Sequence, residues 1–61
     1  MIAEERRKII LEKIKSNNSV SVQELAKEFG ITDATIRRDL DMLDQQGLVK
    51  RSHGGAVIVS Q

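Results

Sequence analysis

The chain has 61 residues, enough for one small domain, and a chain of this size buries only about 60% of the surface that it exposes when unfolded. It has no cysteine and one histidine, which excludes disulfides, thiolate metal sites and a zinc cluster, and we expect no cofactor, no bound metal and no enzymatic activity. Ten basic and nine acidic residues give a net charge of +1. No apolar run is long enough for a membrane helix and no signal peptide is recognisable, so we expect a cytoplasmic protein.

Basic residues gather in three short clusters, although the total charge is balanced. The clusters are Arg6–Lys8, Arg37–Arg38 and Lys50–His53, and the last lies in a stretch, 45–61, that has no acid. For any one cluster the simplest interpretation is a solvated surface. Three clusters near one surface would be harder to explain in that way, so their positions in the fold matter.

Two amphipathic helices are predicted in the first half of the chain. The first runs from about Ala3 to Lys15 and ends at a polar turn over 16–19, after which Val20 fits a very short extended segment. The second begins at Ser21 with a capping box and ends at Gly30, in about two turns. Their predicted buried faces comprise Ile10, Leu11, Ile14, Val22, Leu25, Ala26 and Phe29.

A third helix follows almost immediately. Thr32 is its expected N-cap, and Gly47 ends it after Gln46. Its predicted buried face comprises Ile36, Leu40 and Leu43 with Met42 at the margin, and its outward face comprises Ala34, Arg38, Asp41 and Gln45, flanked by Thr35 and Arg37.

The last residues have the pattern of a β-hairpin. Leu48–Arg51 is the first predicted strand, Ser52–Gly55 the turn and Ala56–Val59 the returning strand. Because an isolated hairpin is marginal in water, it should pack on the helices through Leu48 and some of 57–59.

The order of these elements predicts a winged helix-turn-helix, mainly α with a small β-hairpin, consisting of three helices and a two-stranded wing in a single domain, 1–61. The helix-turn-helix spans about 21–46 and the wing about 48–59. The short turn Gly30–Thr32 should set two helices at roughly 90–120°, so that the second protrudes. An α-helix fits the major groove of B-DNA, which is about 12 Å wide. An ordinary helical hairpin in a small core is the alternative, since a fold pattern does not fix function.

The side chains favour DNA over that alternative. Arg37 and Arg38 can pair with guanine or clamp a phosphate, although they can instead pair with nearby acids such as Asp41, at about 0.3–0.5 kcal/mol per pair. Glycines at the hairpin tip let backbone amides approach a phosphate, while His53 fits a turn-capping surface role equally well. The predicted DNA contacts are Thr32, Ala34, Thr35, Arg37 and Arg38 in the major groove, Lys50, Arg51, His53, Gly54 and Gly55 on the backbone or adjacent minor groove, and Ser21 on a phosphate.

Two separated motifs resemble those of a known family. The run TIRRDL at 35–40 and the run HGGA at 53–56 are similar to the recognition helix and the wing of DeoR-type helix-turn-helix domains, and the resemblance extends over about 3–59. It implies the N-terminal DNA-binding domain of a bacterial repressor of a sugar-utilisation operon, associated with the nucleoid, whose partner is double-stranded operator DNA. It also implies a homo-oligomeric full-length protein whose C-terminal domain, outside this chain, binds a phosphorylated sugar as effector.

A winged helix used for protein–protein contact is the alternative function. Such a role calls for an apolar outer face on the third helix, which the polar outward residues do not provide.

Overall fold

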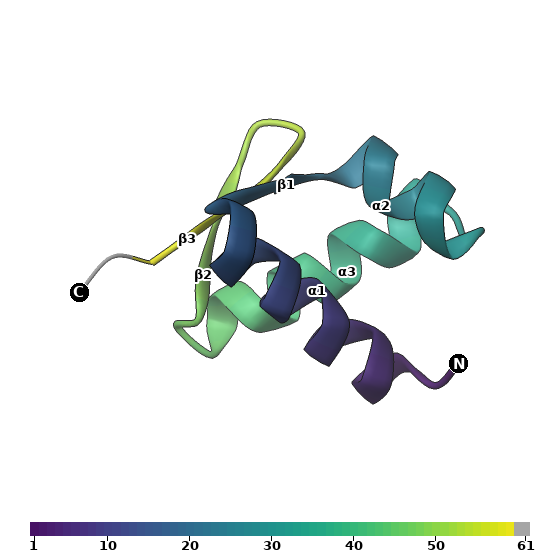
Figure 1. Cartoon of the computed structure of the whole chain (residues 1–61), viewed down its shortest axis with the longest axis horizontal. Coiled ribbons are helices and arrows are strands. Elements are labelled where there is room, and N and C mark those ends of the chain that lie inside the picture. The colour runs from purple at the N-terminus through teal and green to yellow at the C-terminus, as the bar shows by residue number, and fades with distance from the viewer. Residues whose placement is uncertain (60–61) are drawn as a thin grey trace.

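A computed structural model describes residues 1–59, which form three helices and three strands (Figure 1). The elements are α1 (Ala3–Asn17), β1 (Ser19–Ser21), α2 (Val22–Phe29), α3 (Asp33–Gln45), β2 (Val49–Ser52) and β3 (Gly55–Ile58). The predicted fold class, three helices with a small β-hairpin, is confirmed, and the last two residues of the predicted domain lie outside the described part. Within that part no helix is long and apolar enough to cross a membrane.

The N-terminal helix extends two residues further than predicted. It ends at Asn17 because Asn18 takes a left-handed conformation, φ 71°, which asparagine tolerates, and its N–H donates to the carbonyl of Ile14 at 2.6 Å. The next helix starts at the predicted cap, where the N–H of Glu24 donates to Oγ of Ser21 at 3.4 Å. The reciprocal bond of a capping box, from the Ser21 N–H to the Glu24 carboxylate, is absent from the side-chain hydrogen bonds of residues 1–59.

The connection between α2 and α3 is as short as predicted. Gly30 lies in the left-handed region at φ 69°, and the N–H of Ile31 donates back to the carbonyl of Ala26 at 3.0 Å. Since most residues avoid this φ, glycine allows the chain to leave one helix and enter the next within three residues. Thr32 caps α3 by accepting from the N–H of Thr35 at 3.3 Å.

The strands form one antiparallel sheet in the order β1-β3-β2. The predicted hairpin is β2 with β3, and the short extended segment at Val20 is a third strand, in which Val20 pairs with Ala56. The sheet is therefore one strand wider than the predicted wing. Because β3 is central, β2 forms an edge beside α3.

The hairpin turn is shorter than predicted. Ser52 pairs with Gly55, so only two residues form the turn, while Arg51 lies opposite Ala56, as the predicted strands imply. Successive side chains of a strand point to opposite faces of the sheet. Val49 is buried at 2% exposure and its neighbour Leu48 is 39% exposed, so the prediction that Leu48 packs on the helices is wrong.

One hydrophobic core joins the helices to the sheet. The predicted helix faces are confirmed, except that Leu11 and Phe29 are only partly buried at its margin. Ile58 packs against the same core, as expected for part of the returning strand. The buried hydrophobic residues are Ile10, Ile14, Val22, Leu25, Ala26, Ile36, Leu40, Leu43, Val49 and Ala56.

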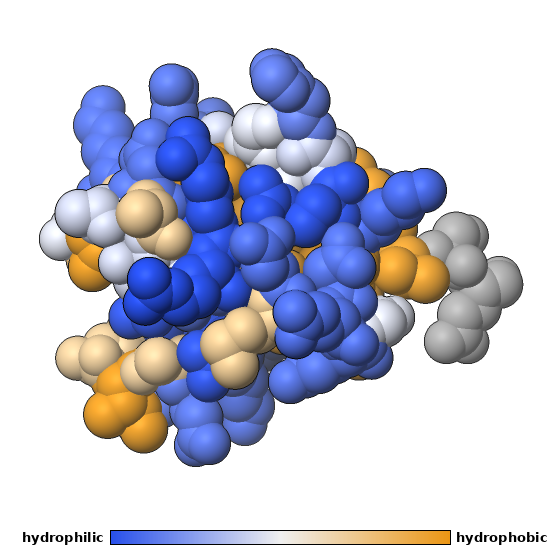
Figure 2. Space-filling view, turned by 180° about the vertical axis from the view of Figure 1, so that it is seen from behind, coloured by the Kyte–Doolittle hydropathy of each residue, from blue (hydrophilic) through white to orange (hydrophobic). Residues whose placement is uncertain are grey.

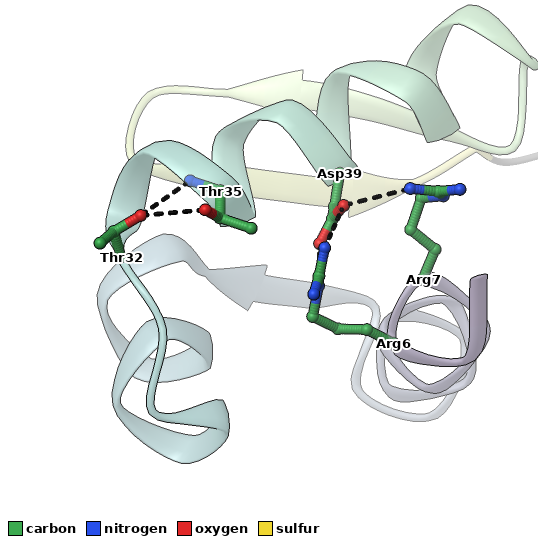
Figure 3. Close-up of polar contacts among 5 residues, drawn as sticks. All are labelled: Arg6, Arg7, Thr32, Thr35 and Asp39. Carbon is green, nitrogen blue, oxygen red and sulfur yellow. Dashed lines mark hydrogen bonds and ion pairs between the residues drawn. The ribbon is translucent and has the colours of Figure 1, made fainter. Parts of the chain in front are cut away.

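A charged side chain, Asp39, is also buried, with 2% exposure. Figure 3 shows that two arginines of α1 reach it: Arg6 donates from Nε to Oδ2 and from Nη2 to Oδ1 (3.0 Å), and Arg7 donates to Oδ1 at 3.4 Å. The hydrogen bond with Asp39 raises the pKa of the Arg6 guanidinium above its ordinary value; burial opposes the shift and the charge of Asp39 adds to it. Two residues of the basic cluster 6–8, Arg6 and Arg7, therefore hold α1 against α3, while Lys8 is exposed.

Candidate nucleic-acid interface

The outward face of α3 is polar and open. In Figure 1 this helix lies behind α1, and Figure 2, which views the molecule from behind, shows hydrophilic side chains across the middle of that side. The predicted orientation of the helix is confirmed, since Ala34, Arg37, Arg38, Asp41 and Gln45 are exposed and Thr35 is half-buried.

The two arginines of this helix, Arg37 and Arg38, form no ion pair with neighbouring acids in residues 1–59. The alternative to a DNA contact is an ion pair with an acid of the same helix, which helical spacing allows for Arg38 with Asp41 and for Arg37 with Asp33. Within residues 1–59 neither ion pair is present, and Asp41 instead pairs with Arg51. Both guanidinium groups of α3 are thus exposed without an ion-pair partner in the described part of the chain.

The start of α3 presents hydroxyl groups and backbone N–H groups. The Oγ1 atoms of Thr32 and Thr35 are 3.0 Å apart and share a hydrogen bond (Figure 3), and Thr32 is exposed. The positive end of the helix dipole and its unpaired N–H groups favour a nearby phosphate. Both predicted contact residues therefore lie where a DNA backbone or base edge can reach them.

The hairpin tip lies beside the start of α2. Lys50, His53 and Gly54 are exposed, and the carbonyl of Gly54 accepts from the N–H of Val22 at 2.9 Å. Ser21, which precedes Val22 and is half-buried, is thereby brought next to the wing. The described hydrogen bonds do not link the start of α3 to this tip.

Gly55 occupies a different environment from the neighbouring glycine. It is buried, and a Cβ built on it would lie 2.0 Å from the carbonyl oxygen of Val20 in β1. This glycine permits the close approach of two strands. Its predicted DNA contact stays a prediction, beside a structural role that the sequence did not reveal.

Arg51 points to α3. Its Nε donates to the carbonyl of Gly55 at 3.0 Å and its Nη1 to the carbonyl of Arg37 at 3.3 Å, and the same nitrogen pairs with the carboxylate of Asp41. Its backbone N–H donates to Oδ2 of Asp44 at 2.8 Å. The side chain keeps 25% exposure, so its predicted contact with DNA would compete with these partners.

In the described part of the chain, no three histidine, aspartate or glutamate side chains gather closely enough to suggest a metal site.

Comparison with known proteins agrees with the helix-turn-helix fold. The family model for the DeoR-like helix-turn-helix domain matches residues 6–61. The chain is 43% identical over 61 residues to the uncharacterized HTH-type transcriptional regulator YulB of Bacillus subtilis, covering 100% of this chain and 24% of that protein. It is 45% identical over 60 residues to the HTH-type transcriptional regulator GlpR of Haloferax volcanii, covering 98% and 24% of the two chains.

A third relative is the glycerol-3-phosphate regulon repressor of Escherichia coli, 45% identical over 51 residues, or 84% of this chain and 20% of that protein. The chain thus spans about a quarter or less of the length of these curated relatives. No solved structure matches it significantly. Because the family model matches most of its residues, the chain belongs to the DeoR-like helix-turn-helix family and is a DNA-binding domain.

Proposed function

We propose that the protein represses a sugar-utilisation operon by binding double-stranded operator DNA, with α3 in the major groove and the β2–β3 hairpin on the backbone or adjacent minor groove. The observation that carries this proposal is the exposure of Arg37 and Arg38 on α3, without acidic partners in residues 1–59. Arginines so placed can reach base edges or phosphates. The 13 residues of α3 give a rod of about 20 Å, long enough to lie along the groove.

The relatives support the biological part of the proposal. They include the lactose phosphotransferase system repressor of Lactococcus lactis and the putative galactitol utilization operon repressor of Escherichia coli. By analogy, the effector is a phosphorylated sugar bound by a C-terminal domain outside this chain, and the whole protein is a homo-oligomer on the bacterial nucleoid, in the cytoplasm. A protein–protein module finds no support in α3, whose exposed face is polar.

Arg38→Ala tests the placement of α3. A duplex is first enriched from a random-sequence pool by the wild-type chain, and binding is measured by fluorescence anisotropy. The variant should lose about 1–3 kcal/mol of affinity for that duplex if the guanidinium pairs with a base. Lys15→Ala, which removes an exposed cation in the last turn of α1, should change the affinity much less.

Unchanged binding by both Arg37→Ala and Arg38→Ala, with helicity retained in circular dichroism, would contradict the groove assignment. Arg38→Lys adds a second criterion. It preserves the charge but lacks the planar, rigid pair of donors, so lysine should restore a base contact only in part.

Lys50→Ala tests the placement of the wing. This exposed cation should contact a phosphate, and a phosphate contact carries no sequence information. The variant should bind the enriched duplex and an unrelated duplex more weakly by the same factor. In a titration with salt, the slope of log affinity against log salt should fall by about one unit. A loss confined to the enriched duplex would instead assign Lys50 to base recognition.

A further inference from the structure

Arg51 joins the wing to the proposed recognition helix more extensively than any other side chain in residues 1–59. Its guanidinium contacts both elements at once, through the carbonyl of Gly55 in β3 and through Arg37 and Asp41 in α3. The partners from α3 lie one helical turn apart. One planar group with several fixed donors can satisfy this arrangement, whereas a lysine cannot.

The backbone of the same residue makes a second link. Strand β2 is at the edge of the sheet, so one of its sides has no strand partner. Asp44 of α3 covers that edge by accepting from the N–H of Arg51 at 2.8 Å. Two acids of α3 thus hold one residue of the wing, by its side chain and by its main chain.

We propose that Arg51 is a positioning residue, which fixes the wing relative to α3, and that Asp41 and Asp44 strengthen DNA binding by holding it there. This inference rests on the proposed function. The neighbouring polar side chains of the wing, Lys50 and His53, are exposed and stay available for the DNA. Their distance from the arginines of α3 is set by the Arg51 link.

Simple electrostatics predicts the opposite effect of Asp41 on DNA binding. Asp41 is 58% exposed on the helix that would face the DNA, so removing its charge should relieve repulsion from phosphate and tighten binding. If Arg51 itself contacted a phosphate, removing its ion pair with Asp41 would tighten binding further. If Arg51 positions the wing, loss of Asp41 should weaken binding instead. The two roles predict effects of opposite sign.

Asp41→Asn is the deciding variant, measured with the enriched duplex and the whole 61-residue chain. We expect binding to weaken about two- to fivefold, the range that an exposed ion pair can contribute. Asp33→Asn is the matched control, an acid of the same helix without an ion-pair partner in residues 1–59; it should leave binding unchanged or tighten it. In an Arg51→Gln background, Asp41→Asn should weaken binding no further, because the pair is already broken. Tighter binding by Asp41→Asn would overturn the inference.

Hydrogen exchange gives a readout that needs no DNA. In the free chain, Asp41→Asn and Arg51→Gln should both speed amide exchange in β2 and β3, while exchange in α1 is unchanged. Unaltered exchange in the hairpin would also overturn the inference. If the wild-type chain binds no duplex, the proposed function fails, whereas the exchange experiment still reports on the link. If the wild type binds and the exchange is unaltered, only the positioning role fails.

Discussion

Asp39→Ala is expected to lower the free energy of unfolding by about 3 kcal/mol, the lower end of the ~3–5 kcal/mol for breaking a buried ion pair. The carboxylate is 2% exposed and accepts from both Arg6 and Arg7. Its loss leaves two cations without their partner. These side chains keep 13% and 19% exposure, so they still reach water, which places the cost at the low end. Thermal unfolding followed by circular dichroism should show a Tm lower by about 12–24 °C.

Two variants make this expectation specific. Asp39→Asn keeps one carbonyl acceptor for Arg6 and should cost less than the alanine variant. Glu12→Ala removes an exposed acid of α1 and should change the stability by no more than about 0.5 kcal/mol. A loss for Asp39→Ala as small as that for Glu12→Ala would show that the buried pair contributes nothing.

The loss of stability caused by Asp39→Ala should not change between neutral and moderately alkaline pH. The folded protein raises the pKa of Arg6, so its contribution is complete below the pKa of the unfolded chain and is lost only as pH rises through the folded pKa. Both values lie far above neutrality. The difference in Tm between wild type and variant should therefore stay constant from pH 7 to about pH 10.

The helices could be predicted because their signals are local. A capping hydroxyl at Ser21 or Thr32 acts on an N–H three residues away, and Gly30 acts on the turn that contains it. The apolar spacing of Ile36 and Leu40 reports one helix face directly. Such features do not depend on the rest of the fold, so the helix-turn-helix and the outward face of α3 were both predictable.

The polar contacts between elements could not be predicted in this way. Asp39 lies three residues after Ile36, at a position that the helical period assigns to the buried face, and a charge at such a position signals a buried partner. That partner is 33 residues away, in α1. The same applies to Asp41, which local spacing pairs with Arg38 but the fold pairs with Arg51. The choice depends on where the hairpin lies.

The strands gave the weakest signals. The run from Leu48 to Arg51 has two apolar residues side by side, so alternation does not show which of them faces the core, and the core contact was predicted for Leu48 instead of Val49. Strand β1 has three residues, two of them serine, so its own sequence gives almost no strand signal. It is a strand because the fold places it beside β3, with which it pairs. Its presence explains why Gly55 must be glycine, which a hairpin of two strands would not.

Gly55→Ala is expected to lower the free energy of unfolding by about 3 kcal/mol, the upper part of the ~1–3 kcal/mol range for overpacking. A Cβ at this position would lie 2.0 Å from the carbonyl oxygen of Val20 and 3.3 Å from Cα of Ser21. These are backbone atoms, so no side chain can rotate away. Strand β1 must move from β3, and the pairing of Ser21 with Gly55 is lost. The loss should appear as a lower Tm, with faster amide exchange in β1.

Gly54→Ala is the matched control, because the two substitutions add the same methyl group to adjacent residues. At Gly54 the new Cβ has no heavy atom within 4 Å, but φ is 79°. The cost there should be the backbone strain alone, about 1–2 kcal/mol. At Gly55 the cost is steric and should exceed it. If Gly55→Ala is no more destabilising than Gly54→Ala, then β1 can move away from β3 at little cost, and the close approach of these strands contributes little to the stability of the sheet.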